Sequence, residues 1–158
     1  MAIYLSIHNI KGSITAQGYQ GCIQVFNYHS RHFRPITERP SINSNRTLGT
    51  HDRSSLRVSK KVDISTPPLL SQYYNSTSIP ALVFHHVTTG NNPQCYLENT
   101  FHHVLLTGFE EFCCEDGATE EIEMVFMSQE KRVMNMASDH TLSSPQSVGY
   151  DYGTMQSI

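Results

Sequence analysis

The sequence contains no tryptophan, little positive charge and no long apolar run. Lysine and arginine together account for 11 of 158 residues, against 14 acidic residues, which gives a formal net charge of -3. Nucleic acids and anionic membranes attract concentrated positive charge, so neither is expected as the main partner. No stretch approaches the roughly 18 consecutive apolar residues that a membrane-spanning helix needs. The composition therefore predicts a protein that neither binds nucleic acid nor inserts into a membrane.

The start of the chain also lacks the features of a secretory signal peptide. Residues 1–5, MAIYL, carry no basic segment, and no long apolar core or cleavage site follows them. We expect the protein to be made and folded in the cytoplasm. Any export is expected to use a route that does not read a signal peptide.

The four cysteines are irregularly spaced and form no Cys-x-x-Cys motif. We interpret Cys22, Cys95, Cys113 and Cys114 as small buried apolar residues that stay reduced. A nucleophilic pair of Cys113 or Cys114 with a histidine is an alternative. Neither cysteine lies in a recognisable motif, however, and no Gly-x-Ser-x-Gly sequence is present. The sequence therefore predicts no catalytic residue and no enzyme.

Alternation of apolar and polar residues predicts a mainly β fold. Segments 81–88 and 94–107 flank a turn-forming run at 90–93 and are expected to pair as an antiparallel hairpin. Mostly local connections favour two antiparallel sheets forming a flattened β-barrel, with one short α-helix packed on one side. Residues 1–158 are expected to form a single domain. The strands are predicted at 3–8, 22–32, 56–64, 81–88, 94–107 with a continuation to 114, 122–128, 132–136 and 148–152.

The clearest local signal is a strand that runs into a helix, in residues 61–70, KVDISTPPLL. Ser65 or Thr66 is expected to cap the helix, because a side-chain oxygen there accepts a hydrogen bond from a free N–H of the first turn. Pro67 suits the first helical position, where its missing N–H costs nothing. The helix is predicted at about residues 67–74.

Residues 34–53 show no periodic pattern and are rich in proline, serine, asparagine and arginine. A loop of that length inside a small domain is uncommon, and it is usually either functional or disordered. Both interpretations stay open from the sequence alone.

Four segments, in order along the chain, resemble motifs of the haemolysin-coregulated protein (Hcp) family, the inner-tube subunits of type VI secretion systems. They are 3–13 (IYLSIHNIKGS), 23–28 (IQVFNY), 61–69 (KVDISTPPL) and 96–106 (YLENTFHHVLL). Overall length and the long loop after the second strand agree as well, so the likeness covers nearly the whole chain. The chain departs from the family pattern at an expected tryptophan, where Tyr28 stands, and at a charged pair, where His102 and His103 stand.

The resemblance implies a structural role, with no catalysis and no cofactor. Members of the family form hexameric rings that stack into a tube inside a contractile sheath, and contraction drives the tube and its spike out of the cell. The ring lumen can hold small effectors. The implied partners are further copies of the chain and the sheath, spike and effector proteins of the type VI system. The implied location is the bacterial cytoplasm, followed by secretion.

Charged side chains are the candidate residues for contact between subunits. Arginines of the loop at 34–53 would form an arm that stacks on the neighbouring ring, and acidic residues near the turn at 115–117 would receive them. Solvated loops are the alternative interpretation of both segments. The predicted interface residues are Arg34, Arg39, Arg46, Arg53, Glu120 and Glu121.

The chain has nine histidines, several of them in adjacent pairs. One member of His85-His86 and one of His102-His103 could meet across the predicted hairpin and bind Zn²⁺ or Ni²⁺, although no cysteine or carboxylate at ligand spacing joins them. We prefer exposed polar positions and assign no metal. Charging of clustered histidines near pH 6 is a further hypothesis, for pH-sensitive assembly. The alternative function is a monomeric β-sandwich binding module with a histidine-based metal or glycan site, and oligomeric state distinguishes the two.

Overall fold

The computed structural model describes residues 1–33, 36–37, 47–48, 55–90, 93–135 and 143–158. These residues form 11 strands and one helix, so the fold is mainly β, as predicted. The helix is α1 (Thr66–Tyr74). The strands are β1 (Ala2–Ile7), β2 (Ile23–Ser30), β3 (Ile36–Thr37), β4 (Thr47–Leu48), β5 (Leu56–Lys61), β6 (Ile79–Val87), β7 (Cys95–Cys114), β8 (Gly117–Val125), β9 (Ser128–Val133), β10 (Gln146–Asp151) and β11 (Gln156–Ser157).

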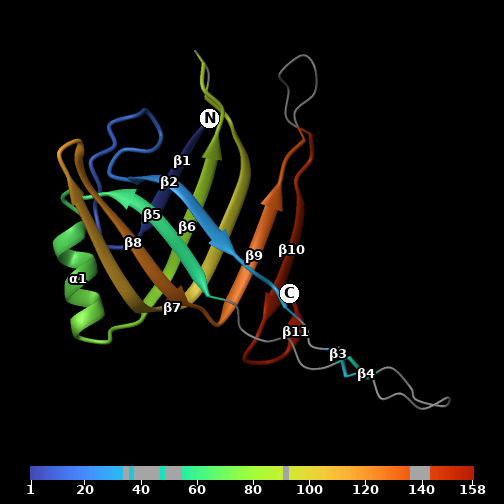
Figure 1. The fold of residues 1–158 in the computed structure, drawn as a ribbon. Coiled ribbons are helices and arrows are strands. Elements are labelled where there is room, and N and C mark those ends of the chain that lie inside the picture. The colour runs from blue at the N-terminus through green and yellow to red at the C-terminus, as the bar shows by residue number, and fades with distance from the viewer. Residues whose placement is uncertain (34–35, 38–46, 49–54, 91–92, 136–142) are drawn as a thin grey trace.

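Six strands close into a barrel in the order β7-β6-β1-β2-β5-β8, because β8 pairs with β7 as well as with β5. All of these pairings are antiparallel. Closure depends on β7, which is 20 residues long: its first half pairs with β6 and its second half with β8. Figure 1 shows α1 lying against one side of the barrel. The predicted β-barrel with one short helix on its side is confirmed.

The barrel interior is apolar and follows the alternation of the sequence. In β1, Leu5 and Ile7 are buried on the inner face, and in β2 the same holds for Ile23 and Val25. Leu69 of α1 joins this core from outside the sheet. The buried cluster consists of Leu5, Ile7, Ile10, Ile23, Val25, Leu56, Val58, Leu69, Ile79, Leu82, Phe84, Phe101, Val104, Leu106, Ile122, Met124 and Phe126.

The start of α1 is predicted correctly, but the predicted capping bond is wrong. Ser65 is the N-cap residue and Pro67 lies in the first turn, yet no side chain caps the free N–H groups there. The Ser65 hydroxyl donates to Asp63, and the Thr66 hydroxyl donates to Glu120 of β8. Both hydroxyls are therefore used to fasten the helix start to the barrel wall rather than to cap the helix.

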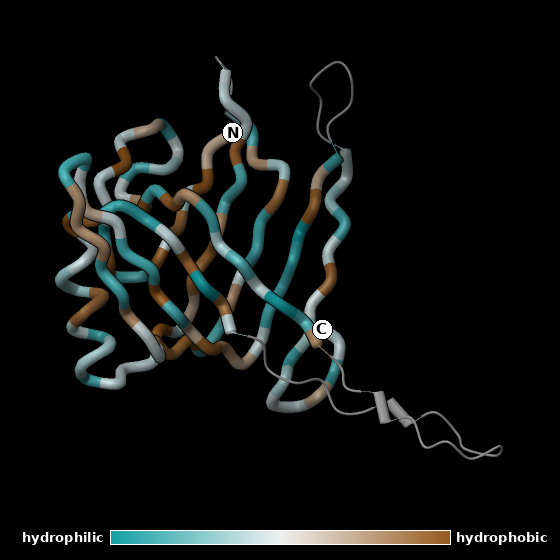
Figure 2. Tube along the Cα trace, viewed as in Figure 1, coloured by the Kyte–Doolittle hydropathy of each residue, from teal (hydrophilic) through white to brown (hydrophobic). Residues whose placement is uncertain are grey.

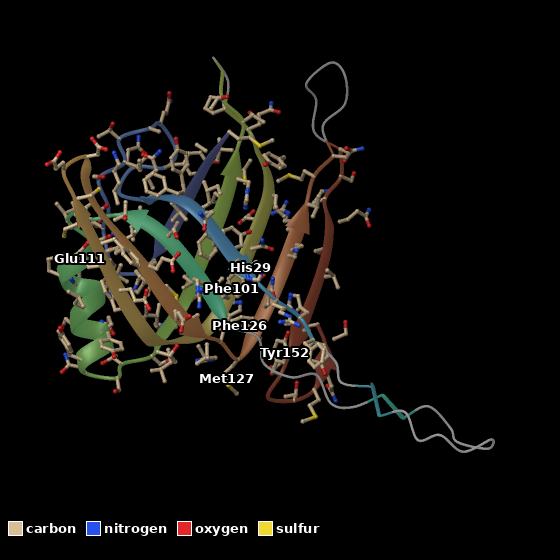
Figure 3. The ribbon with its side chains drawn as sticks, in the orientation of Figure 1. His29, Phe101, Glu111, Phe126, Met127 and Tyr152 are labelled. Carbon is tan, nitrogen blue, oxygen red and sulfur yellow. The ribbon has the colours of Figure 1, made fainter. Side chains whose placement is uncertain are left out.

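Three strands, β9, β10 and β11, continue the sheet beyond the barrel, and we call them the strand extension. β9 pairs with the first half of β7, β10 with β9, and β11 with β10. Aromatic rings connect the extension to the core, with centroids 4.7 Å apart for Phe101 and Phe126 and 5.7 Å apart for Phe126 and Tyr152. Figure 3 shows these three side chains in a row from the barrel towards the C-terminal strands.

The loop between β1 and β2 is fixed by its own backbone hydrogen bonds. The N–H of Gly12 donates to the carbonyl of Gly21, and the N–H of Gly21 donates to the carbonyl of Ile14, each at 2.8 Å. Gly12 lies directly on the chain entering β2, where a Cβ would stand 2.3 Å from the carbonyl oxygen of Cys22. Only glycine fits this position without a backbone shift.

We expect Gly12→Ala to lower the free energy of unfolding by about 1–3 kcal/mol, because the added methyl meets backbone atoms that cannot rotate away. Gly18→Ala in the same loop is the matched control, since nothing lies within 4 Å of the added carbon there. Its cost comes only from the positive φ of 84° and is about 1 kcal/mol. Urea unfolding of both variants tests the prediction, which an equal loss in the two would contradict.

The four cysteines are free thiols in unlike surroundings. Cys22 is buried, Cys95 is half-buried, and Cys113 and Cys114 are exposed at the end of the β7–β8 hairpin. The prediction of buried cysteines is therefore right for Cys22 and wrong for Cys113 and Cys114, because the hairpin extends beyond the core.

Candidate functional site

A buried ionic cluster connects β5, β8 and the start of α1. The side chains of Lys60 and Glu120 are both 0% exposed, and Lys60 Nζ lies 2.5 Å from Glu120 Oε1. The same ammonium group donates to Asp63 Oδ1 at 2.9 Å and to the backbone carbonyl of Lys61 at 2.9 Å. Removing two charges from water is costly, and only such a set of partners offsets it.

Thr66 and Ser65 complete the cluster from the helix. The Thr66 hydroxyl donates to the Glu120 carboxylate at 3.0 Å and accepts the N–H of Asp63 at 3.2 Å. Asp63 Oδ1 also accepts the N–H of Ser65 at 3.0 Å. Burial alone would raise the pKa of the Asp63 carboxyl, but the hydrogen bonds from Ser65 and Lys60 outweigh it and lower the pKa below its ordinary value.

This cluster explains the motif at 61–69 in physical terms, with one correction to its extent. The lysine that holds Asp63 and Glu120 is Lys60, one residue before the run singled out in the sequence. The signal was present, because Lys60 shares the inward face of β5 with Leu56 and Val58. The Lys60–Glu120 pair is fully enclosed, whereas the Asp63 side chain is 15% exposed. The hydrogen bonds of the cluster are made within the chain, so the cluster positions the start of the helix.

The predicted interface residues fall into two groups. Arg34, Arg39, Arg46 and Arg53 lie outside the described residues. Glu120 faces its own Lys60 in the interior of the chain and is 0% exposed, and its interface role stays a prediction.

Glu121, the next residue, points the other way and is half-buried. Its carboxylate accepts a hydrogen bond from Ser59 at 3.2 Å. It also lines a hollow of about 260 Å³ together with Glu110, Glu123 and Tyr73. The interface role of Glu121 stays a prediction. Glu110 and Glu123 place two further carboxylates in the same hollow.

The paired histidines do not meet across the hairpin, so the alternative of a metal ion bound between them has no geometric support. His85 lies opposite Glu98 and His86 opposite Leu97, whereas His102 lies opposite Ala81. The expectation that no cysteine or carboxylate joins the histidines is wrong. His85, Cys95 and Glu98 place one ligand atom each within 4.8 Å of one another.

His86 points to the inner face, where it contributes to a small polar group. Its Nε2 lies 2.9 Å from the hydroxyl of Tyr28, which also contacts the side-chain amide of Asn99. Burial lowers the pKa of His86 and raises that of Tyr28. Tyr28, which replaces an expected tryptophan, stacks on Phe84 with 4.0 Å between ring centroids. Its ring therefore fills space in the core and its hydroxyl satisfies polar neighbours.

The exposed cysteines lack the features of an activated nucleophile. The Cys113 thiol donates to Glu111 at 3.2 Å, and this hydrogen bond raises the pKa of the thiol. A raised pKa leaves less thiolate, which is the reactive form.

Across the described segments, no helix is both long and apolar enough to cross a membrane.

Comparison with known proteins gives one family and several similar structures. A family model described as "Type VI secretion system effector, Hcp" matches residues 4–133. A solved structure of a type six secretion system protein is similar with a TM-score of 0.90 at 17% identity, and 99% of each chain is covered. Hcp1 from Salmonella typhimurium has a TM-score of 0.78 at 18% identity, with 99% of this chain and 98% of that chain covered.

A third similar structure is a type VI secretion system effector from Yersinia pestis, with a TM-score of 0.70 at 19% identity. The match covers 94% of this chain and 98% of the Yersinia pestis chain. No curated protein matches the sequence. At these sequence identities, the structural matches establish the fold alone. The family model, by contrast, matches most of the residues of the chain.

Proposed function

Because the chain belongs to the Hcp family of type VI secretion systems, we propose that it is a tube subunit that assembles into hexameric rings, and that these rings stack. The function is structural, with no catalytic step. The partners are further copies of the chain, the sheath and spike of the secretion system, and effectors held in the ring lumen. The protein would assemble in the bacterial cytoplasm and leave the cell with the tube.

The strand extension carries this proposal. β10 is exposed over its first three residues, and β9 is exposed or half-exposed over its last four. In a monomer, much of β9 and β10 therefore does not pack against the barrel core on either face. Figure 1 shows β9 and β10 standing beside the barrel, and in Figure 2 both strands are mostly hydrophilic, with one short hydrophobic segment on each. Strands left uncovered in this way favour a neighbouring molecule as cover.

Two exposed valines form the apolar surface of the strand extension. Val133 is 42% exposed and Val148 is 64% exposed. Val148 also lines a groove of about 350 Å³ with Tyr150, Tyr152 and His32, where β10 passes the residues that follow β2. We assign this groove to the next copy of the chain in the ring, because a repeated head-to-tail contact with rotation closes a ring.

Stacking between rings would use the charged surfaces. The hollow of Glu110, Glu121 and Glu123 presents three carboxylates, of which the Glu123 carboxylate also pairs with Arg57. The arginine-bearing segment at 34–53 of a neighbouring subunit has the complementary charge. Glu121→Lys is the variant that tests this contact. Glu120→Lys would not, because it would place a second lysine beside Lys60 in the buried cluster.

The experiment that tests the proposed function is the solution mass of the purified chain, measured by light scattering over a wide range of concentration, with electron micrographs of the same sample. We expect a mass of six subunits and ring-shaped particles. A monomer of 17.9 kDa at every concentration would contradict the proposal and favour the monomeric binding module.

A further inference from the structure

The outer surface of the barrel carries a convergent set of three metal-binding side chains. His85 comes from β6, and Cys95 and Glu98 come from β7. One ligand atom of each lies within 4.8 Å of the other two, and His85 Nδ1 lies 4.0 Å from Glu98 Oε1. A metal ion bound by imidazole, thiolate and carboxylate at about 2.0–2.3 Å fits between atoms at this separation after small side-chain movements.

An irregularity in β7 brings the cysteine into the set. Cys95 and Glu98 are three residues apart, and in a regular strand such residues point to opposite faces. The pairing of His86 with Leu97 and of Val87 with Cys95 leaves one extra residue, Tyr96, on β7. This bulge turns Cys95 to the face that carries His85 and Glu98. Bulges that redirect a side chain are common beside functional sites.

The surroundings make the set partly enclosed but reachable. The side chains of His85 and Glu98 are 21% and 29% exposed. Tyr19, from the loop between β1 and β2, covers them with its ring centroid 5.6 Å from that of His85. The Cys95 thiol donates to the backbone carbonyl of Leu97 at 3.4 Å. All three residues of the set are thus only partly covered by the protein.

The charges of the set suit a divalent cation. Burial lowers the pKa of His85, which favours the neutral imidazole over the charged form. Burial raises the pKa of Cys95, and the nearby Glu98 carboxylate raises it further. Without a bound cation, a thiolate here would lie beside the negatively charged Glu98 carboxylate. With a divalent cation, carboxylate and thiolate together balance the charge, and the thiol proton is released to solvent.

The second oxygen of Glu98 is held from the other side. Arg132 Nη1 of β9 lies 3.9 Å from Glu98 Oε2, which leaves Oε1 directed to His85. An outer contact of this kind orients a carboxylate ligand. The row of His85, Glu98 and Arg132 runs across β6, β7 and β9 because the three are direct cross-strand neighbours.

We propose that His85, Cys95 and Glu98 form a Zn²⁺ site with three protein ligands and one open position. The donor set excludes the hard cations, since Mg²⁺ and Ca²⁺ are bound by oxygen and not by thiolate. Zn²⁺ accepts mixed sulfur, nitrogen and oxygen ligands in tetrahedral geometry. The site stands apart from the buried cluster and does not depend on the proposed ring.

The experiment uses the full chain, stripped with a chelator and titrated with Co²⁺ and then with Zn²⁺. We expect one equivalent of Co²⁺ to give the intense visible bands of a tetrahedral site and a thiolate-to-cobalt charge-transfer band in the near ultraviolet. Zn²⁺ should abolish both. This spectrum needs no variant, and its absence would overturn the proposal.

Two variants assign the ligands. Cys95→Ser should lose the charge-transfer band and bind Zn²⁺ at least about tenfold more weakly, because even outer contacts of metal sites contribute that much. Glu98→Gln should keep the charge-transfer band and also bind more weakly. Cys113→Ser, which removes an exposed thiol elsewhere on β7, is the matched control and should bind as the wild type does. Unchanged Zn²⁺ affinity in Cys95→Ser would overturn the assignment.

Discussion

Replacing Lys60 with methionine is expected to lower the free energy of unfolding by about 3–5 kcal/mol, the largest effect of any single substitution considered for this fold. Methionine fills much of the same space but leaves the Glu120 carboxylate buried without its cation. Both side chains are 0% exposed, so water cannot take over the lost contact. The loss also frees Asp63 from its lysine partner and loosens the start of α1.

The chain provides a matched control on the same pair of strands. Arg57 of β5 pairs with Glu123 of β8, three residues along from Lys60, but both of these side chains are substantially exposed, at 55% and 41%. An exposed pair contributes about 0–1 kcal/mol, so Arg57→Met should cost much less than Lys60→Met. Urea unfolding of both variants measures the difference.

A double variant separates the lost ion pair from lost packing. Lys60→Met combined with Glu120→Leu removes both charges, so we expect it to be less destabilised than Lys60→Met alone. If Lys60→Met costs no more than Arg57→Met, the cluster does not hold the fold in the way that its geometry indicates.

Regular alternation of apolar and polar residues predicted the strands of the barrel, because a strand with one face in the core needs an apolar residue at every second position. β1 and β2 are examples: Leu5 and Val25 repeat with the period of two that the core requires. Proline after a capping residue predicted the start of α1 just as directly. Mostly local connections between the strands predicted that the sheets form a flattened barrel.

The departures have separate causes. Lys60 precedes the motif at 61–69, although its position in the alternation of β5 places it inside. Cys95 and Glu98 share a face only because Tyr96 is an extra residue in β7. A bulge leaves no pattern in a single sequence, so the three-ligand set could not be predicted. β11, with two residues, is too short for any periodic signal.

The second large effect concerns assembly, and it follows from the exposed strand extension. Val148→Asp places a carboxylate in the groove that we assign to the next subunit. The new carboxylate lies opposite Lys131 of β9, which lines the same groove. Burying it in the contact still removes it from water, so the dissociation constant between subunits should rise by about one order of magnitude or more. Light scattering should then show monomers where the wild type forms rings.

Ile64→Asp is the matched control for Val148→Asp. Ile64 is 66% exposed, close to the 64% of Val148, and it is also a β-branched aliphatic residue. It lies before α1, away from the strand extension, so the same change in charge there should leave the ring intact. Both variants should unfold at wild-type urea concentrations as isolated subunits, because neither side chain is in the core. If the two variants lose assembly equally, general negative charge weakens the ring. If neither does, the groove on β10 is not the contact that closes it.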